Sequence, residues 1–131
     1  MKQLKFEHVY AEKIKKGEKT ATFRVNDDKD IIAGDRVELV DKVDNTSPPS
    51  WLLTGVLLIN EVEIKAIAQL GTEYFNSGGD FKDSLEMIAT FRRFYGEHVD
   101  ENTQVTILRF EFIPYETPRK FLEQNSTNER F

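Results

Sequence analysis

The feature that most limits the fold is a long β-forming stretch, Trp51–Leu70, which is rich in apolar and β-branched residues. Such residues favour a pleated, half-buried strand. A stretch of this length predicts one long bent strand or two consecutive strands. Its longest apolar run lies within Trp51–Ile59 and is too short to cross a bilayer. We therefore expect a sheet-based protein that does not interact with membranes.

Shorter β-forming segments lie on both sides of this stretch. Alternating or β-branched residues predict short strands at Leu4–Phe6, Thr20–Val25 and Arg36–Val40, and a longer one at Thr103–Ile113. The polar segment Asp41–Ser50 contains Pro48-Pro49 and is expected to be a loop.

Three helical segments are predicted. Val9–Lys16 is followed by Gly17, which can adopt the left-handed conformation that ends a helix. Thr72–Phe75 can form a single turn. A third helix over 83–95 begins with Asp83 and Glu86 at capping-box spacing. Its expected apolar stripe consists of Leu85, Ile88, Ala89, Phe91, Phe94 and Tyr95.

The order of these elements does not alternate strictly between strand and helix, so a parallel doubly wound sheet is not expected. An α+β fold, with a mixed β-barrel and two or three short helices packed on it, fits the order better. The 131 residues suit one domain, which we assign to residues 1–113. Residues 114–131 are mostly polar and are expected to form a frayed C-terminal tail, with one helical turn near Arg119–Gln124.

Composition excludes several kinds of site. The chain has no cysteine and two histidines, so we expect no disulfide, no metal site and no cofactor. The first residues lack an apolar segment, so no cleaved signal peptide is expected. These features fit a cytoplasmic protein.

Charge is unevenly distributed along the chain. The net charge is −5, which argues against a surface that coats nucleic acid. Residues 1–25 nevertheless carry seven Lys or Arg against three Glu. This excess predicts a local anion site. A simpler alternative is that Lys13, Lys15 and Lys16 form a solvated helix end, where cations oppose the helix dipole favourably.

Three motifs in order resemble the ASCH family. The first is Gly17-Glu18-Lys19-Thr20-Ala21-Thr22-Phe23-Arg24, similar to the family signature G-x-K-T-x-T-x-R. The second is the turn Gly34-Asp35-Arg36-Val37. The third is an acidic loop at Gly79-Asp80, followed by a helix that ends in Phe94-Tyr95-Gly96 and by a final strand. The resemblance extends from Leu4 to Phe112.

The resemblance implies a PUA-like barrel that binds RNA or a nucleoside in a cleft beside the first motif. Some small ASCH proteins are amidohydrolases that deacetylate N4-acetylcytidine. Their catalytic lysine and threonine match Lys19 and Thr22, and their catalytic glutamate aligns with Asp80, fifteen residues before Tyr95. Asp80 is one methylene shorter than that glutamate. The loop around Pro48-Pro49 and the C-terminal extension are further departures from the family.

Strand geometry suggests how the first motif could build a site. Side chains alternate along a strand, so Thr20, Thr22 and Arg24 share one face. Ala21 and Phe23 are then expected to enter the core. Lys19 can approach Thr22 only if Lys19 lies in the turn after Gly17.

Amide hydrolysis would assign chemical roles to these residues. A threonine hydroxyl becomes a useful nucleophile when a base accepts its proton. Lysine can act as that base if burial or neighbouring cations lower its pKa. Arg24 or backbone amides could stabilise the oxyanion, and Asp80 could orient the lysine, carry a proton or bind an exocyclic amine.

The sequence supports three alternative functions. The first is binding of RNA or a nucleoside through Lys19, Thr20, Thr22, Arg24 and Asp80. The second is an N4-acylcytidine amidohydrolase that uses Lys19, Thr22 and Asp80 for catalysis. The third is a protein-interaction module. As structural alternatives, the threonines are ordinary strand residues, Asp80 is a turn residue, and Trp51 packs inside the protein and does not stack on a base.

Overall fold

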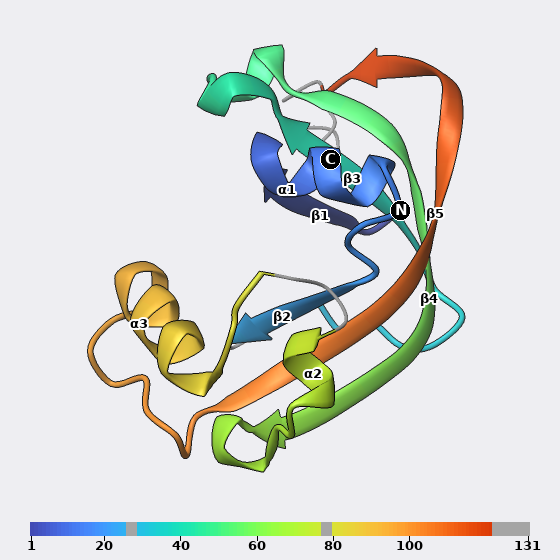
Figure 1. The fold of residues 1–131 in the computed structure, drawn as a ribbon. Helices are drawn as coiled ribbons and strands as arrows, with labels where there is room; N and C mark the ends of the chain where they lie inside the picture. The colour runs from blue at the N-terminus through green and yellow to red at the C-terminus, as the bar shows by residue number, and fades with distance from the viewer. Residues whose placement is uncertain (26–28, 77–79, 122–131) are drawn as a thin grey trace.

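The computed structural model of the protein describes residues 1–25, 29–76 and 80–121. Five strands form one mixed sheet with the order β1-β3-β4-β5-β2 (Figure 1). β1 and β3 are parallel, and the other neighbours are antiparallel. The strands are β1 (Gln3–Glu7), β2 (Ala21–Val25), β3 (Arg36–Lys42), β4 (Leu52–Ala66) and β5 (Gln104–Lys120). The α+β class and the PUA-like arrangement predicted from the sequence are therefore confirmed.

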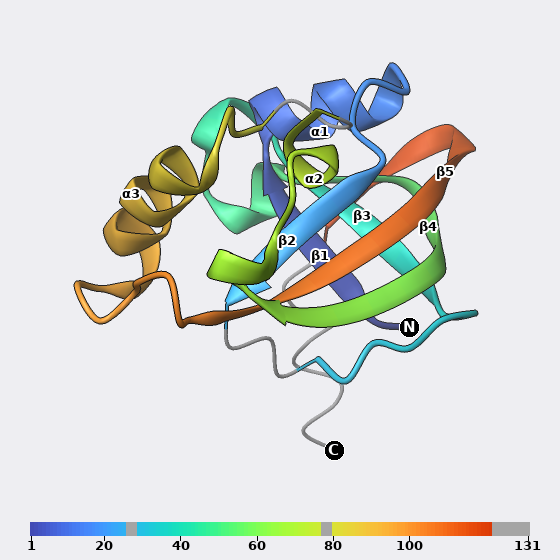
Figure 2. The same ribbon diagram turned by 60° about the horizontal axis from the view of Figure 1, so that its bottom comes forward.

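The sheet is strongly curved but does not close into a barrel (Figures 1 and 2). β4 has register shifts between Leu53 and Gly55 and between Ile59 and Glu61, and such irregularities bend a strand. Gly55 permits close packing at the first shift, because a Cβ there would lie 2.5 Å from the Ile113 carbonyl oxygen. β1 and β2 remain the two edges of the sheet, so the expectation of a closed barrel was wrong.

Three α-helices and three short 3₁₀ turns complete the described fold. The helices are α1 (His8–Lys15), α2 (Glu73–Asn76) and α3 (Ser84–Tyr95), and the 3₁₀ turns are η1 (Val43–Asn45), η2 (Pro48–Ser50) and η3 (Ile67–Gln69). Gly17 follows α1 with φ of 79°, as its sequence position predicted. Asp83 caps α3, and its carboxylate accepts a hydrogen bond of 2.9 Å from the Glu86 amide.

The face that α3 buries differs from the predicted stripe. Met87 and Phe91 are buried, whereas Leu85 is 77% exposed and Phe94 is 61% exposed. Positions 87 and 91 are one turn apart and face the sheet together. Apolar composition and helical spacing predict an apolar face on this helix. They do not specify which of two neighbouring apolar faces packs against the sheet.

Two main apolar clusters occupy the concave side of the sheet. One gathers around α1 and includes Leu4, Ala11 and Ile14, together with residues of β3, β4 and β5. The other lies under α2 and α3 and includes Met87 and Phe91. The separation of α1 from α3 in Figure 1 matches this division into two clusters.

The C-terminal segment is part of the sheet. β5 continues to Lys120, and Phe121 is 1% exposed in a small cluster with Val40 and Leu53. Glu38 accepts hydrogen bonds from the Tyr115 hydroxyl (2.5 Å) and from Arg119 (2.7 Å). The expected end of the strand at Ile113 and the helical turn beginning at Arg119 were therefore wrong. Residues 122–124 of that turn lie outside the described part, and the division at residue 113 stays a prediction.

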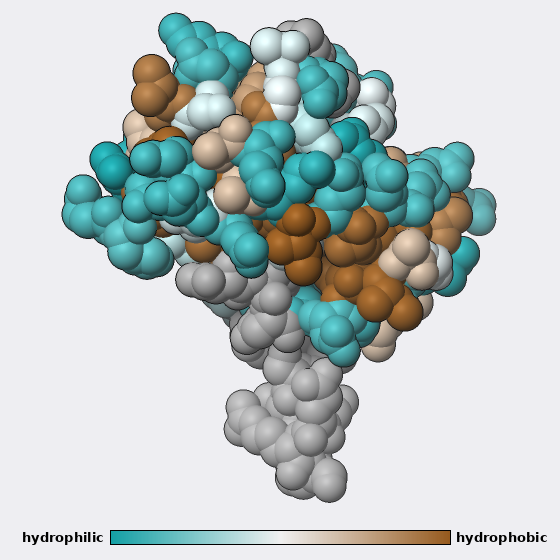
Figure 3. Space-filling model, turned by 90° about the horizontal axis from the view of Figure 1, so that it is seen from below, coloured by the Kyte–Doolittle hydropathy of each residue, from teal (hydrophilic) through white to brown (hydrophobic). Residues whose placement is uncertain are grey.

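The surface mixes apolar and hydrophilic side chains. Figure 3 shows apolar side chains gathered right of centre on the face seen from below, while hydrophilic side chains cover much of the left. Within residues 1–25, 29–76 and 80–121, no helix is both long and apolar enough to cross a membrane.

Candidate functional site

A cleft of about 280 Å³ lies between the two edges of the open sheet. β1 and β2 line it from opposite sides, α1 contributes Tyr10, and α3 contributes aromatic side chains. In Figure 1 this region lies between the upper group of α1 and β1 and the lower group of β2 and α3. The open gap between the two edge strands therefore forms this cleft.

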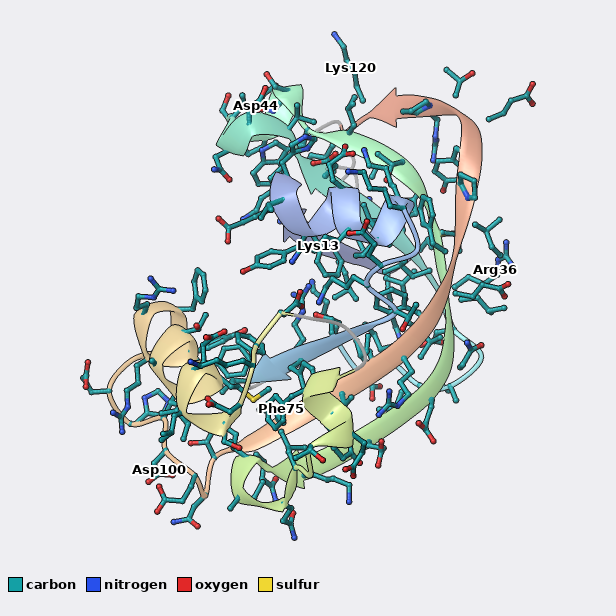
Figure 4. The ribbon with its side chains drawn as sticks, viewed as in Figure 1. Lys13, Arg36, Asp44, Phe75, Asp100 and Lys120 are labelled. Carbon is teal, nitrogen blue, oxygen red and sulfur yellow. The ribbon has the colours of Figure 1, made fainter. Side chains whose placement is uncertain are left out.

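Lys19 is the central cation of this cleft. Its side chain is 3% exposed, its ammonium group forms an ion pair with Asp80, and it lies 5.7 Å from the centre of the Tyr10 ring. The Gly17 turn delivers it there, because the Lys19 amide still bonds to the Lys13 carbonyl of α1. Burial lowers the pKa of Lys19 below its ordinary value, and Asp80 opposes this shift while Arg24 and Lys13 add to it. Lys13 is labelled in Figure 4, on the side of α1 nearer β2.

Asp80 has one oxygen engaged and one free. Its side chain is 9% exposed, and Oδ2 accepts the hydrogen bond from Lys19. Oδ1 is buried and has no hydrogen-bond partner within the described part of the chain. A buried carboxylate oxygen is costly to leave unpaired, so this position favours a ligand that donates an N–H or O–H group. Gly79, which precedes Asp80 in the acidic loop of the third motif, lies outside the described residues.

Thr22 lines the same cleft and is 5% exposed. It lies on β2, opposite Leu108 of β5, so a rigid strand positions its hydroxyl group. Among the residues that the structure describes, Thr22 makes no hydrogen bond to Lys19, which instead bonds to Asp80. The cleft thus holds a hydroxyl, an amine and a carboxylate, and the amine and carboxylate are already paired.

Of the other two candidate residues of the motif, Arg24 lies in the cleft and Thr20 does not. Arg24 lines the cleft, lies 4.9 Å above the Phe6 ring and donates a 3.2 Å hydrogen bond to the Lys5 carbonyl. It therefore bridges the open edges of β1 and β2. Thr20 precedes β2, is exposed and lines a different hollow, beside Gly17 and Phe110, so the expected row of three polar side chains was wrong at Thr20.

The apolar partners of the motif also differ from the prediction. Ala21 is buried, as expected for the face opposite Thr22. Phe23 is only half-buried and lines the cleft with Thr22. The strict alternation expected from strand geometry fails here because the cleft reaches around the edge strand, so that both of its faces contribute.

One wall of the cleft consists of aromatic side chains, none of which was predicted to be a site residue. Phe81, Phe91, Phe94 and Tyr95 line it together with Tyr10. The Phe81 and Phe91 ring centres are 5.4 Å apart, and those of Phe91 and Tyr95 are 5.7 Å apart. The aromatic residues at the end of α3 are visible in the sequence, but their helical spacing predicts that they belong to the buried stripe of the helix.

Two further lysines of the cleft, Lys5 and Lys42, were also not identified. Lys5 lies on β1, and Lys42 ends β3. Lys5 belongs to the basic first 25 residues, and this excess of charge was the signal that could have revealed it. Lys42 was hidden because nothing in the sequence shows that the end of β3 reaches the cleft.

A second polar cluster lies outside the cleft. His8 and Glu12 of α1 and buried Asp41 of β3 have possible metal-ligand atoms within 4.8 Å of one another. Lys15 forms ion pairs with Asp41 (3.2 Å) and Glu12 (2.7 Å), so the carboxylates already have a cation beside them. The hydrogen bond that the His8 ring donates to the Asp41 carboxylate raises the pKa of His8, which further supports a charge-paired network that anchors α1 on the sheet.

Comparison with known proteins identifies the fold. Neither a family model nor a curated protein matches the sequence. Solved structures do match. An ASCH protein variant from Zymomonas mobilis has a TM-score of 0.60 and 12% identity, covering 98% of this chain and 92% of that one.

Two further structures agree with this match. An ASCH domain from Lactobacillus crispatus gives a TM-score of 0.59 with 16% identity, over 82% of this chain and 72% of that one. A protein from Enterococcus faecalis, assigned to the family DUF984, gives 0.59 with 18% identity over 84% and 74%. The chain therefore has the fold of solved ASCH-domain proteins.

Proposed function

We propose that the cleft binds a modified nucleoside and hydrolyses an amide on its base, as in N4-acetylcytidine. The observation that carries this proposal is the burial of Lys19, 3% exposed, in one cleft with Asp80 and Thr22. A buried lysine with a lowered pKa is a candidate base.

The proposed chemistry begins with proton transfer to the neutral Lys19 amine from the Thr22 hydroxyl. The Thr22 oxygen attacks the acyl carbon, the C–N bond breaks, and the departing exocyclic amine takes the proton from Lys19. The acyl group is then an ester on Thr22, which a water molecule hydrolyses. Lys19 must first lose its ammonium proton to solvent, and a ligand N–H bound to Asp80 would favour this loss by weakening the ion pair.

The aromatic wall supports a heterocyclic ligand. Phe94 is 61% exposed at the cleft and Tyr95 is 36% exposed, so their rings have surface free for stacking. Stacking of a base on such rings contributes about 1–3 kcal/mol. The unpartnered Asp80 oxygen adds an acceptor for the amide N–H of an acylated base.

RNA binding through the same cleft is the second candidate, favoured by Lys5, Lys42 and Arg24 at its edge. The two candidates respond differently to salt. Affinity for RNA falls steeply as salt rises, because bound counterions are released from the phosphates. A nucleoside carries no phosphate, so its affinity stays nearly constant.

The test is incubation of purified protein with N4-acetylcytidine, followed by chromatography for cytidine. We expect wild-type protein to release cytidine, and Lys19→Ala to reduce the rate by on the order of a hundredfold or more because the base is lost. Asp80→Asn is expected to reduce turnover too, because the carboxylate that accepts the amide N–H of the acylated base is lost. Lys16→Ala is the matched control, since Lys16 is exposed and lies outside the cleft. Deacetylation that survives Lys19→Ala undiminished would reject the proposal.

A further inference from the structure

We propose that the natural ligand of the cleft is a nucleoside monophosphate, whose phosphate binds Lys5 and Lys42. This inference rests on the proposed function and specifies its substrate class. It comes from two cations that the amide chemistry does not use. Both line the cleft, on the side formed by β1 and the end of β3.

Both ammonium groups lie beside one aromatic ring. Lys5 Nζ lies 5.6 Å from the centre of the Trp51 ring, and Lys42 Nζ lies 5.7 Å from the same ring. Lys5 also lies 5.7 Å from the Phe121 ring, which packs against Trp51. Attraction between a cation and a ring restrains each side chain. Both lysines therefore approach the same ring on the side of the cleft formed by β1 and the end of β3.

These two lysines have no ion-pair partner in the part of the chain that the structure describes, whereas Lys2, Lys15 and Lys19 each have one. Glu7 also lines the cleft and weakens the positive potential there. Unneutralised cations that share one end of a cleft attract an anionic group.

The cleft therefore presents three kinds of surface in an order that fits a nucleotide. Lysines occupy the β1 and β3 side, Lys19 and Asp80 are buried within the cleft, and Phe94 and Tyr95 of α3 form the aromatic side. A base on the aromatic side can direct its amide to Asp80 and Lys19. Its ribose then carries a phosphate toward Lys5 and Lys42.

A mononucleotide fits better than an RNA strand. The cleft measures about 280 Å³, which suits one nucleotide unit. The chain as a whole carries a net charge of −5, which repels a polyanion beyond the cleft.

The test is isothermal titration calorimetry with cytidine, cytidine 5′-monophosphate, cytidine 3′-monophosphate and a short single-stranded RNA. We expect one monophosphate to bind roughly tenfold more tightly than cytidine, from one or two charge-assisted contacts. The double variant Lys5→Gln/Lys42→Gln should remove this difference. Lys65→Gln, outside the cleft, should retain it and is the matched control. Added salt should reduce the preference, because Lys5 is exposed and Lys42 is half-buried, so that salt screens both charges.

Hydrolysis of N4-acetylcytidine, measured in parallel, separates the two proposals. Equal affinity for cytidine and both monophosphates, with hydrolysis intact, would overturn the phosphate site and leave the proposed function standing. Absence of both binding and hydrolysis would overturn both proposals. RNA could instead bind more tightly than either monophosphate, and the double lysine variant could remove this difference. That result would overturn the assignment to a mononucleotide.

Discussion

Lys19 illustrates how much of the site could be predicted at the scale of single residues. Its position in the motif and the need for a turn after Gly17 could be inferred from the sequence. Its 3% exposure could not, because burial depends on Tyr10 and Asp80, which lie on other elements. Asp80 is 61 positions away, and only the resemblance to ASCH proteins linked the two residues.

The pKa of Lys19 gives a prediction that does not depend on turnover. Burial lowers this pKa from its ordinary 10.5, and the Asp80 carboxylate partly restores it. We therefore expect heteronuclear NMR to show Lys19 losing its proton below pH 10.5, and at a lower pH still in Asp80→Asn. A rise of the Lys19 pKa in Asp80→Asn would contradict the assigned ion pair.

At the scale of elements, local signals predicted the helix and strand positions well. Gly17 marks the end of α1 and Asp83 caps α3, because both effects operate within a few residues. The C-terminal end of β5 was missed because its polar residues look unfolded on their own. It is held by distant partners, namely Glu38 for Tyr115 and Arg119, and the Trp51 region for Phe121.

Phe121 tests whether this end of the chain belongs to the core. The side chain is 1% exposed, so Phe121→Ala should lower the free energy of unfolding by about 3–5 kcal/mol in urea denaturation. Phe94→Ala is the matched control, because Phe94 is 61% exposed and its loss should cost far less. Equal, small effects of the two variants would show that the segment after Ile113 is a dispensable tail.

At the scale of the whole molecule, the order of elements predicted an α+β fold but not the open sheet. Closure depends on whether β1 and β2 pair, and no local pattern encodes contact between two edge strands. Their separation leaves the cleft between Lys5, Phe6 and Glu7 on one side and Thr22, Phe23 and Arg24 on the other. The same lack of nonlocal information hid Lys42 and the aromatic wall.

The central claim is that Lys19, Thr22 and Asp80 act on an acyl group bound in this cleft. A crystal structure of the Lys19→Ala protein soaked with N4-acetylcytidine tests it most directly. The account predicts a base against Phe94 and Tyr95, with its acyl carbon about 3–3.5 Å from the Thr22 hydroxyl oxygen, a distance suited to attack. A ligand bound outside the cleft, or one whose acyl group points away from Thr22, would contradict the account.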